Sequence, residues 1–198
     1  MDQSAQKTCT AFDGPRCIAS GDLRDVASRV KEHVDAGAAQ PVLIFEDATG
    51  APIDLDLRGG VVDVLSRLPL PAAQTPSADE QRRPGRPKLG VLAREVTLLP
   101  RHWEWLNSQP GGASVALRKL VDDARRANGD KDRVRHAQSA AYKFMSAMAG
   151  NETGFEEAAR ALFAGDAKRF DDLTESWPID VRAHTRKLAA MAFGFAEQ

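Results

Sequence analysis

The stretch REVTLLPRHWEWLNSQPGGASVALRKLVDDARR, residues 94–126, carries the clearest structural signal in this chain of 198 residues. At its start, Val96 and Leu98 alternate with side chains of the opposite face, which is typical of a short strand over residues 94–99. Pro100 ends that strand and suits the first position of a helix, where its missing N–H leaves no helical bond unmade. We therefore expect a strand that leads directly into a helix.

Two glycines and a serine then predict a second helix. Gly111 and Gly112 break the chain sharply, and the hydroxyl of Ser114 can cap the backbone that follows. We expect this helix to end near Asn128-Gly129-Asp130, because glycine is a poor helix former. Its apolar positions recur at helical spacing and predict a buried face formed by Leu117, Leu120, Val121 and Ala124, while Trp103 and Leu106 form an apolar stripe on the first helix.

The predicted strand has no neighbour in the sequence with which it could form a ladder. The N–H and C=O groups along its edges need partners, so the unit is incomplete within one chain. Pairing with the same strand of a second chain would give an antiparallel two-stranded ribbon over four helices. The sequence therefore predicts a homodimer through residues 94–99.

Charge is distributed unevenly along the chain, although its net charge is only −1. Residues 81–136 carry 13 Lys and Arg against 6 Asp and Glu, whereas residues 1–80 carry 7 against 13. A local positive field attracts phosphate polyanions, and acidic flanks limit indiscriminate binding. This distribution favours binding of double-stranded DNA by the central segment. A merely solvated basic helix face is the alternative.

A basic arm, RRPGRPK at residues 82–88, precedes the strand. Its Gly85-Arg86-Pro87 core matches an AT-hook, in which a narrow extended tripeptide enters the minor groove of A·T-rich DNA and Arg86 is inserted. Arg83 and Lys88 flank this core, and together with Arg101 they are expected to contact phosphate. A solvated basic linker is the alternative interpretation of the same residues.

The order of strand, proline-initiated helix, glycine-containing turn and serine-capped helix resembles the ribbon-helix-helix family of bacterial repressors over this central stretch. The resemblance implies that the ribbon lies in the major groove, with Arg94 at the start of the strand and Thr97 on its outward face. It also implies that the helix N-terminus at Ser114 binds phosphate through backbone N–H groups. The chain departs from the family in presenting Glu95 and Thr97 where base-reading strands usually present Arg, Lys, Asn or Gln.

The whole chain is predicted to be an α+β protein with three parts. An N-terminal domain over residues 1–70 contains two hairpins and helices, the first hairpin turning at Asp13-Gly14-Pro15 and the second at Thr49-Gly50. The helix between the hairpins is expected to be capped by Ser20 or Asp22 and to end at Gly37. In the second hairpin, Ile53, Leu55 and Leu57 alternate with Asp54 and Asp56, which predicts one buried face. Residues 71–90 form a basic, proline-rich linker. A domain over residues 91–198 combines the strand-helix-helix unit with further C-terminal helices, the last of which begins at Pro178.

Motifs for catalysis or cofactor binding are missing from the sequence. The spacing of His102 and Glu104 occurs in zinc deaminases, but the Pro-Cys-x-x-Cys half of that site is absent. The acidic residues of the second hairpin, Glu46, Asp47, Asp54 and Asp56, are typical of a solvated strand face. We therefore expect no enzyme, no cofactor and no metal.

The expected location is the cytoplasm. The sequence lacks an apolar run of membrane-spanning length and a signal peptide, so we expect no membrane association. Cys9 and Cys17 are spaced neither as a redox pair nor as a zinc knuckle, and are expected to be ordinary thiols in a reducing compartment.

Short strings along nearly the whole length resemble a bacterial family of uncharacterised proteins. They are TAFDG, VLIFEDATG, LDLRG, GRPKLGV, REVTLLPRHWEWL, QPGGASVALRKLV and WPIDVRAH. This resemblance supports the central unit as a genuine feature of a family, but it implies no chemistry and no functional residue.

The C-terminal helices are rich in aromatic and methionine side chains. These side chains either form a core or line a pocket for a small apolar effector. They are Tyr142, Phe144, Met145, Met148, Phe163, Phe170 and Trp177. The leading hypothesis is thus a dimeric DNA-binding transcriptional regulator. A ligand-binding or protein-interaction module that dimerises without binding DNA is the alternative, followed by an uncharacterised enzyme.

Overall fold

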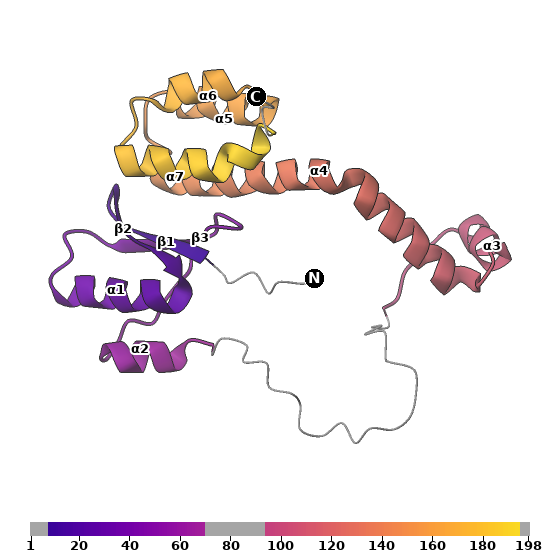
Figure 1. Cartoon of the computed structure of the whole chain (residues 1–198), viewed down its shortest axis with the longest axis horizontal. Helices are drawn as coiled ribbons and strands as arrows, with labels where there is room; N and C mark the ends of the chain where they lie inside the picture. The colour runs from indigo at the N-terminus through magenta and orange to yellow at the C-terminus, as the bar shows by residue number, and fades with distance from the viewer. Residues whose placement is uncertain (1–7, 70–93, 195–198) are drawn as a thin grey trace. The chain divides into compact units, whose positions relative to one another are not determined.

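A computed structural model of the chain describes residues 8–69 and 94–194. Within these residues the protein is α+β, with three strands, seven α-helices and a short 3₁₀ helix (Figure 1). The chain divides into two compact units: unit 1 comprises residues 1–69 and 130–198, and unit 2 comprises residues 70–129. None of the helices in the described ranges combines the length and apolar character needed to cross a bilayer.

Unit 1 is built on an antiparallel sheet of three strands in the order β2-β1-β3. The strands are β1 (Thr8–Asp13), β2 (Arg16–Asp22) and β3 (Val42–Glu46). The first predicted hairpin is confirmed, and Gly14 permits its tight turn because its φ is +55°. Because β1 is central and both of its neighbours are hydrogen-bonded to it, five of its six residues are buried.

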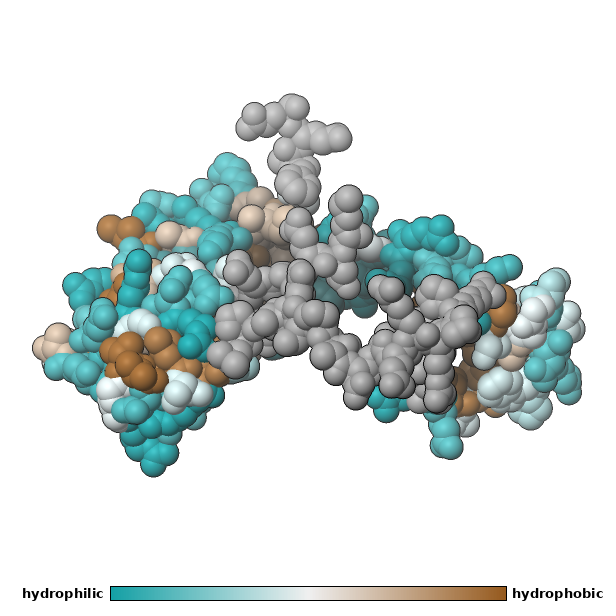
Figure 2. All heavy atoms as spheres, turned by 60° about the horizontal axis from the view of Figure 1, so that its bottom comes forward, coloured by the Kyte–Doolittle hydropathy of each residue, from teal (hydrophilic) through white to brown (hydrophobic). Residues whose placement is uncertain are grey.

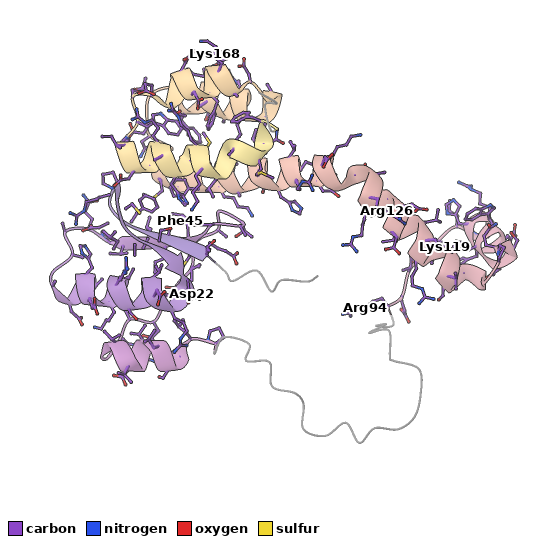
Figure 3. All side chains as sticks on the ribbon, viewed as in Figure 1. Asp22, Phe45, Arg94, Lys119, Arg126 and Lys168 are labelled. Atoms are coloured by element: carbon purple, nitrogen blue, oxygen red, sulfur yellow. The ribbon has the colours of Figure 1, made fainter. Side chains whose placement is uncertain are left out.

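Successive side chains of β1 and β3 point to opposite faces of the sheet, and each face has its own apolar cluster. Cys9, Ala11 and Ile44 pack with α1 (Leu23–Asp35), whereas Phe12 and Phe45 pack with the C-terminal helices. Figure 1 shows α1 on one side of the sheet and α4 and α7 on the other, and Figure 3 shows Phe45 on the sheet. The sheet is therefore the middle layer of unit 1.

Local signals set the ends of α1 as the sequence predicts. The Asp22 carboxylate caps the helix by accepting from the Arg24 N–H at 2.8 Å. Gly37, with a φ of +94°, lies just beyond its last turn. The short helix α2 (Val61–Arg67) follows the sheet and contacts α1.

The second predicted hairpin forms only in part. After β3, the chain makes one isolated bridge, between Phe45 and Pro52, and a hydrogen bond of 2.7 Å from the Ile53 N–H to the Ile44 carbonyl. Pro52 cannot donate to a ladder, which limits the pairing. The predicted alternation nevertheless holds, because Ile53, Leu55 and Leu57 pack on the α1 side of the sheet.

The prediction of a helix end near Asn128-Gly129-Asp130 is wrong. A single helix of 37 residues, α4 (Gly112–Met148), continues through these three positions. Ion pairs between residues three apart, such as Arg126 with Asp123 at 2.9 Å, stabilise the helix on either side of Gly129. One exposed glycine costs only about 1 kcal/mol, which the good helix formers around it offset.

Three further helices complete unit 1: α5 (Phe155–Ala164), α6 (Ala167–Thr174) and α7 (Ile179–Ala189), with a 3₁₀ turn at Ala190–Ala192. Together with the second half of α4 they share one hydrophobic cluster with Phe12 and Phe45 of the sheet. The N-terminal strands and the C-terminal helices, which the sequence assigns to separate domains, thus lie in one compact unit.

Candidate nucleic-acid interface

The candidate interface is in unit 2, and the structure describes four of its seven predicted residues. Arg94, Thr97, Arg101 and Ser114 are all exposed. Arg83, Arg86 and Lys88, which form the predicted basic arm, lie outside the described residues.

The segment at residues 94–99 is not a strand in the single chain. Leu99 has an extended backbone, with φ −66° and ψ 149°, but nothing in the described ranges forms a ladder with this segment. A strand exists only when a second strand satisfies its N–H and C=O groups, and the local pattern cannot supply that partner. Five of the six residues are exposed, Val96 by 54% and Leu99 by 48%.

The helix after this segment begins as predicted. In α3 (Pro100–Ser108), Pro100 occupies the first turn and Leu99 is the N-cap residue. A turn with positive φ at Gly111 (+88°) and Gly112 (+74°) then leads into α4.

Ser114 is not the N-cap of α4, contrary to the prediction. The helix already begins at Gly112, whose N–H donates to the Gln109 carbonyl at 2.9 Å, so Ser114 lies inside the first turn. The carbonyl of Ser114 accepts from Arg118 Nε at 3.1 Å. The first-turn amides of residues 113 and 114 still have no earlier helical carbonyl as acceptor, and such amides can bind an anion.

Basic side chains recur along the unit 2 part of α4 and in the segment from residue 94 to the start of α3. Figure 3 marks Arg94, Lys119 and Arg126 in unit 2. Arg126 pairs with Asp123 at 2.9 Å, whereas Arg94, Arg101, Lys119 and Arg125 make no ion pair within the described part of the chain. Cations without a carboxylate partner lose little on binding a phosphate, so these side chains suit a polyanion.

Apolar side chains in unit 2 are exposed where the sequence predicts burial. Trp103 is 37% exposed, Leu120 46% and Val121 55%, while Leu106 and Ala116 are buried. Trp105, which the sequence analysis passed over, is 51% exposed. Figure 2 shows hydrophobic atoms at the surface around α3 and the start of α4. Helical spacing correctly identifies an apolar face but does not reveal what covers it.

The predicted effector-binding residues of the C-terminal helices are mostly packed against one another. Phe144, Met145, Phe170 and Trp177 are buried in the core of unit 1, and Met148 packs against them. Trp177 Nε1 donates to the Thr153 carbonyl at 3.1 Å. Tyr142 and Phe163 are exposed and contact each other in a tilted arrangement, with their ring centroids 5.5 Å apart. These side chains therefore form a core with an exposed aromatic edge.

A polar cluster in unit 1 was missed by sequence analysis. Asp47 Oδ1 accepts from Thr10 Oγ1 at 2.8 Å and Oδ2 from Lys187 Nζ at 2.8 Å, and His184 Nε2 lies 3.7 Å from Oδ1. Burial lowers the pKa of His184 to about 4, and Lys187 acts in the same direction while Asp47 opposes it. Asp47 and Lys187 are 140 residues apart, so no local pattern could reveal their contact.

The other side chains that could act in catalysis or bind a metal either lie apart from this polar cluster or are unreactive. Burial, followed by the charge of Asp47, raises the pKa of the Cys9 thiol to about 11, which disfavours the reactive thiolate. His102 and Glu104 are both exposed on α3. In residues 8–69 and 94–194, no three His, Cys, Asp or Glu side chains are grouped as a metal site.

A family model described as "Uncharacterized protein conserved in bacteria (DUF2239)" matches residues 8–189. Neither the curated proteins nor the solved structures give a match. None of these comparisons supports the resemblance to ribbon-helix-helix proteins, which stays a prediction.

Proposed function

This chain belongs to the DUF2239 family of uncharacterised bacterial proteins, and on that premise we propose that it is a cytoplasmic, dimeric DNA-binding protein that regulates transcription. The observation that carries the proposal is the set of exposed side chains in unit 2. It combines an extended, unpaired segment with exposed apolar residues and basic side chains that have no carboxylate partner within the described residues.

The apolar residues support the dimer. Val96, Leu99 and Trp105 are each about half exposed, and a second copy of the same surface would remove them from water. Residues 94–99 would then pair antiparallel with their copy, which satisfies the N–H and C=O groups that the single chain leaves without a ladder. In this arrangement, one α3 and one α4 from each chain flank the ribbon.

The charges support DNA as the partner. Residues 81–136 carry a net charge of +7, and a dimer doubles this charge around one two-fold axis. Arg94 and Thr97 would face the groove, Arg101 and the first-turn amides near Ser114 would contact phosphate, and Arg83, Arg86 and Lys88 would follow the backbone or the minor groove. Because Glu95 is a poor base reader, we expect backbone contacts to contribute more than base contacts.

The test is a titration of a fluorescent duplex with the full chain at several salt concentrations. If about four phosphates per subunit are contacted, the logarithm of the association constant falls with the logarithm of salt with a slope near −7, at roughly 0.9 per phosphate. Replacing Arg83, Arg86 and Lys88 together by Ala should flatten that slope by several units.

A matched control is the triple change of Arg160, Lys168 and Arg169 to Ala. These three exposed cations belong to α5 and α6 of unit 1, so the net charge changes equally while the slope should stay unchanged. Absence of duplex binding at low salt, or equal slopes for both triple variants, would contradict the proposal. The protein would then be an interaction module that dimerises without DNA.

A further inference from the structure

A cavity of about 320 Å³ opens in unit 1 beside Lys187. Its walls come from the turn after β3, the part of α4 that belongs to unit 1, and the end of α7. This volume lies at the lower end of the range for small-molecule sites in proteins. We call it the Lys187 cavity.

Side chains that can donate hydrogen bonds to an anion lie around this cavity. Arg133 and His136 project from α4 one turn apart, and Lys187 projects from α7. Arg133 is 63% exposed and forms its ion pair with Asp130 on its own helix, whereas His136 has no polar partner in the described part of the chain. Three donors from two helices thus meet at one opening.

Among the described residues that line the Lys187 cavity, Asp47 is the one carboxylate, and it already accepts hydrogen bonds. Asp47 is 9% exposed and is held by Thr10 and Lys187, both at 2.8 Å. Among the described lining residues, the two cations Arg133 and Lys187 outnumber this carboxylate by one, so the local field of the opening is weakly positive. A negatively charged ligand suits this field better than a neutral or cationic one.

The remaining wall is apolar. Leu188 is 8% exposed and Met191 40% exposed, and small alanine side chains of α4 leave space in front of them. Methionine adapts its shape to an apolar partner. A ligand body of a few carbon atoms could cover this wall while its charged group meets the three donors.

The surrounding structure holds the cavity in place. Gly50, with a φ of +63°, packs against α4 so closely that a Cβ would lie 1.9 Å from the Ala140 carbonyl oxygen. Behind Asp47, the buried His184 Nε2 has no hydrogen-bond partner among the described residues and lies 3.7 Å from Asp47 Oδ1. If an anion draws Lys187 away from Asp47 Oδ2, Asp47 Oδ1 still accepts from Thr10, so the carboxylate keeps one hydrogen bond.

We propose that the Lys187 cavity binds a small organic anion that carries a phosphate or carboxylate group on an apolar body. The anionic group contacts Arg133, His136 and Lys187, and the apolar body lies on Leu188 and Met191. The inference goes beyond the proposed function, because the site lies within unit 1 and its test contains no DNA.

The experiment is an NMR titration of the ¹⁵N-labelled full chain with phenyl phosphate, which has both a dianionic group and an apolar ring. We expect saturable shifts confined to the amides of residues 47–48, 133–140 and 187–191. Inorganic phosphate and benzyl alcohol each supply half of the ligand, so each should bind at least about tenfold more weakly, as expected when one set of contacts is lost.

Two variants locate the site. Arg133→Gln should weaken phenyl phosphate about tenfold through the loss of a charge-assisted hydrogen bond, and Met191→Gln should weaken phenyl phosphate more than inorganic phosphate. Arg160→Gln is the matched control, because Arg160 also pairs with an acid three residues earlier on an exposed helix face, away from the cavity.

The proposal would be overturned by shifts that do not saturate, by shifts spread over other surfaces of the chain, or by equal weakening by Arg133→Gln and Arg160→Gln. Affinities for phenyl phosphate and benzyl alcohol that are the same would also overturn it, because the charged group would then contribute nothing.

Discussion

Unit 1 and unit 2 differ in how far their large apolar side chains are buried. In unit 1, the rings of Phe12, Phe45 and Phe144 are at most 1% exposed, and they contact one another between the sheet and the helices. In unit 2, Trp105 is 51% exposed and Val121 is 55% exposed. A soluble chain rarely leaves such residues grouped at its surface without a partner.

This difference teaches that the two units are completed in different ways. Unit 1 closes its core within one chain, because both faces of the sheet are covered by helices. Unit 2 has only Leu106 and Ala116 buried among its described residues, and we propose that a second copy covers its remaining apolar surface. Substitutions should therefore change folding when they are made in unit 1 and association when they are made in unit 2.

The largest expected effect is on the stability of unit 1. Phe144→Ala removes a fully buried ring that packs 4.9 Å from Phe45 and should lower the free energy of unfolding by about 3–5 kcal/mol. Trp105→Ala, an equally drastic truncation in unit 2, should leave urea unfolding of the monomer nearly unchanged and weaken association instead. A large loss of monomer stability with Trp105→Ala would remove the contrast between the units.

The next effect concerns the ribbon. Thr97→Pro removes one ladder N–H in each subunit, and each loss should reduce the free energy of dimerisation by about 1–1.5 kcal/mol. The two losses together should weaken dimerisation by roughly a hundredfold. Because residues 94–99 form no ladder within the chain, monomer folding should not change. Thr97→Val is the control: it keeps the N–H and a β-branched side chain, so it should retain the dimer. Equal dimer dissociation constants for wild type and Thr97→Pro, from dilution in sedimentation velocity, would argue against a ribbon.

The smallest effect is a pH dependence of unit 1. The pKa of His184 is lowered to about 4 in the folded protein, whereas an unfolded histidine has its ordinary value of 6.5. The unfolded chain therefore binds a proton at this histidine before the folded protein does, and stability is lost as the pH falls from about 6.5 towards 4.

This pH dependence can be assigned by comparing two variants in urea unfolding between these pH values. His184→Gln should remove most of the dependence, although its stability at neutral pH is also lower. His102→Gln, on an exposed face of α3, should leave the dependence as in the wild type. If both variants keep the same slope, His184 is not the titrating group.

Much of unit 1 could be predicted from local signals. The turn at Gly14, the cap at Asp22 and the alternation of Ile53, Leu55 and Leu57 all act over a few residues, and the structure confirms them. The continuity of α4 through Gly129 could not be predicted, because the helix formers around it offset one unfavourable residue.

The candidate interface and the Lys187 cavity were less predictable, for two physical reasons. Periodicity places Leu120 and Val121 on an apolar face, but burial depends on what packs there, and within the described residues both side chains stay about half exposed. The cavity depends on a contact between Asp47 and Lys187, which the fold alone brings together. The predicted strand has the same limitation, since its partner would come from another chain.

The most direct test of the central claim, that unit 2 is completed by a second copy, is sedimentation equilibrium of the full chain without DNA. The account predicts a species of twice the 21.5 kDa chain mass that dissociates on dilution. It also predicts that the Val96→Glu and Trp105→Glu variants sediment at the single-chain mass while unit 1 stays folded. A wild type that sediments at the single-chain mass at every accessible concentration would contradict it.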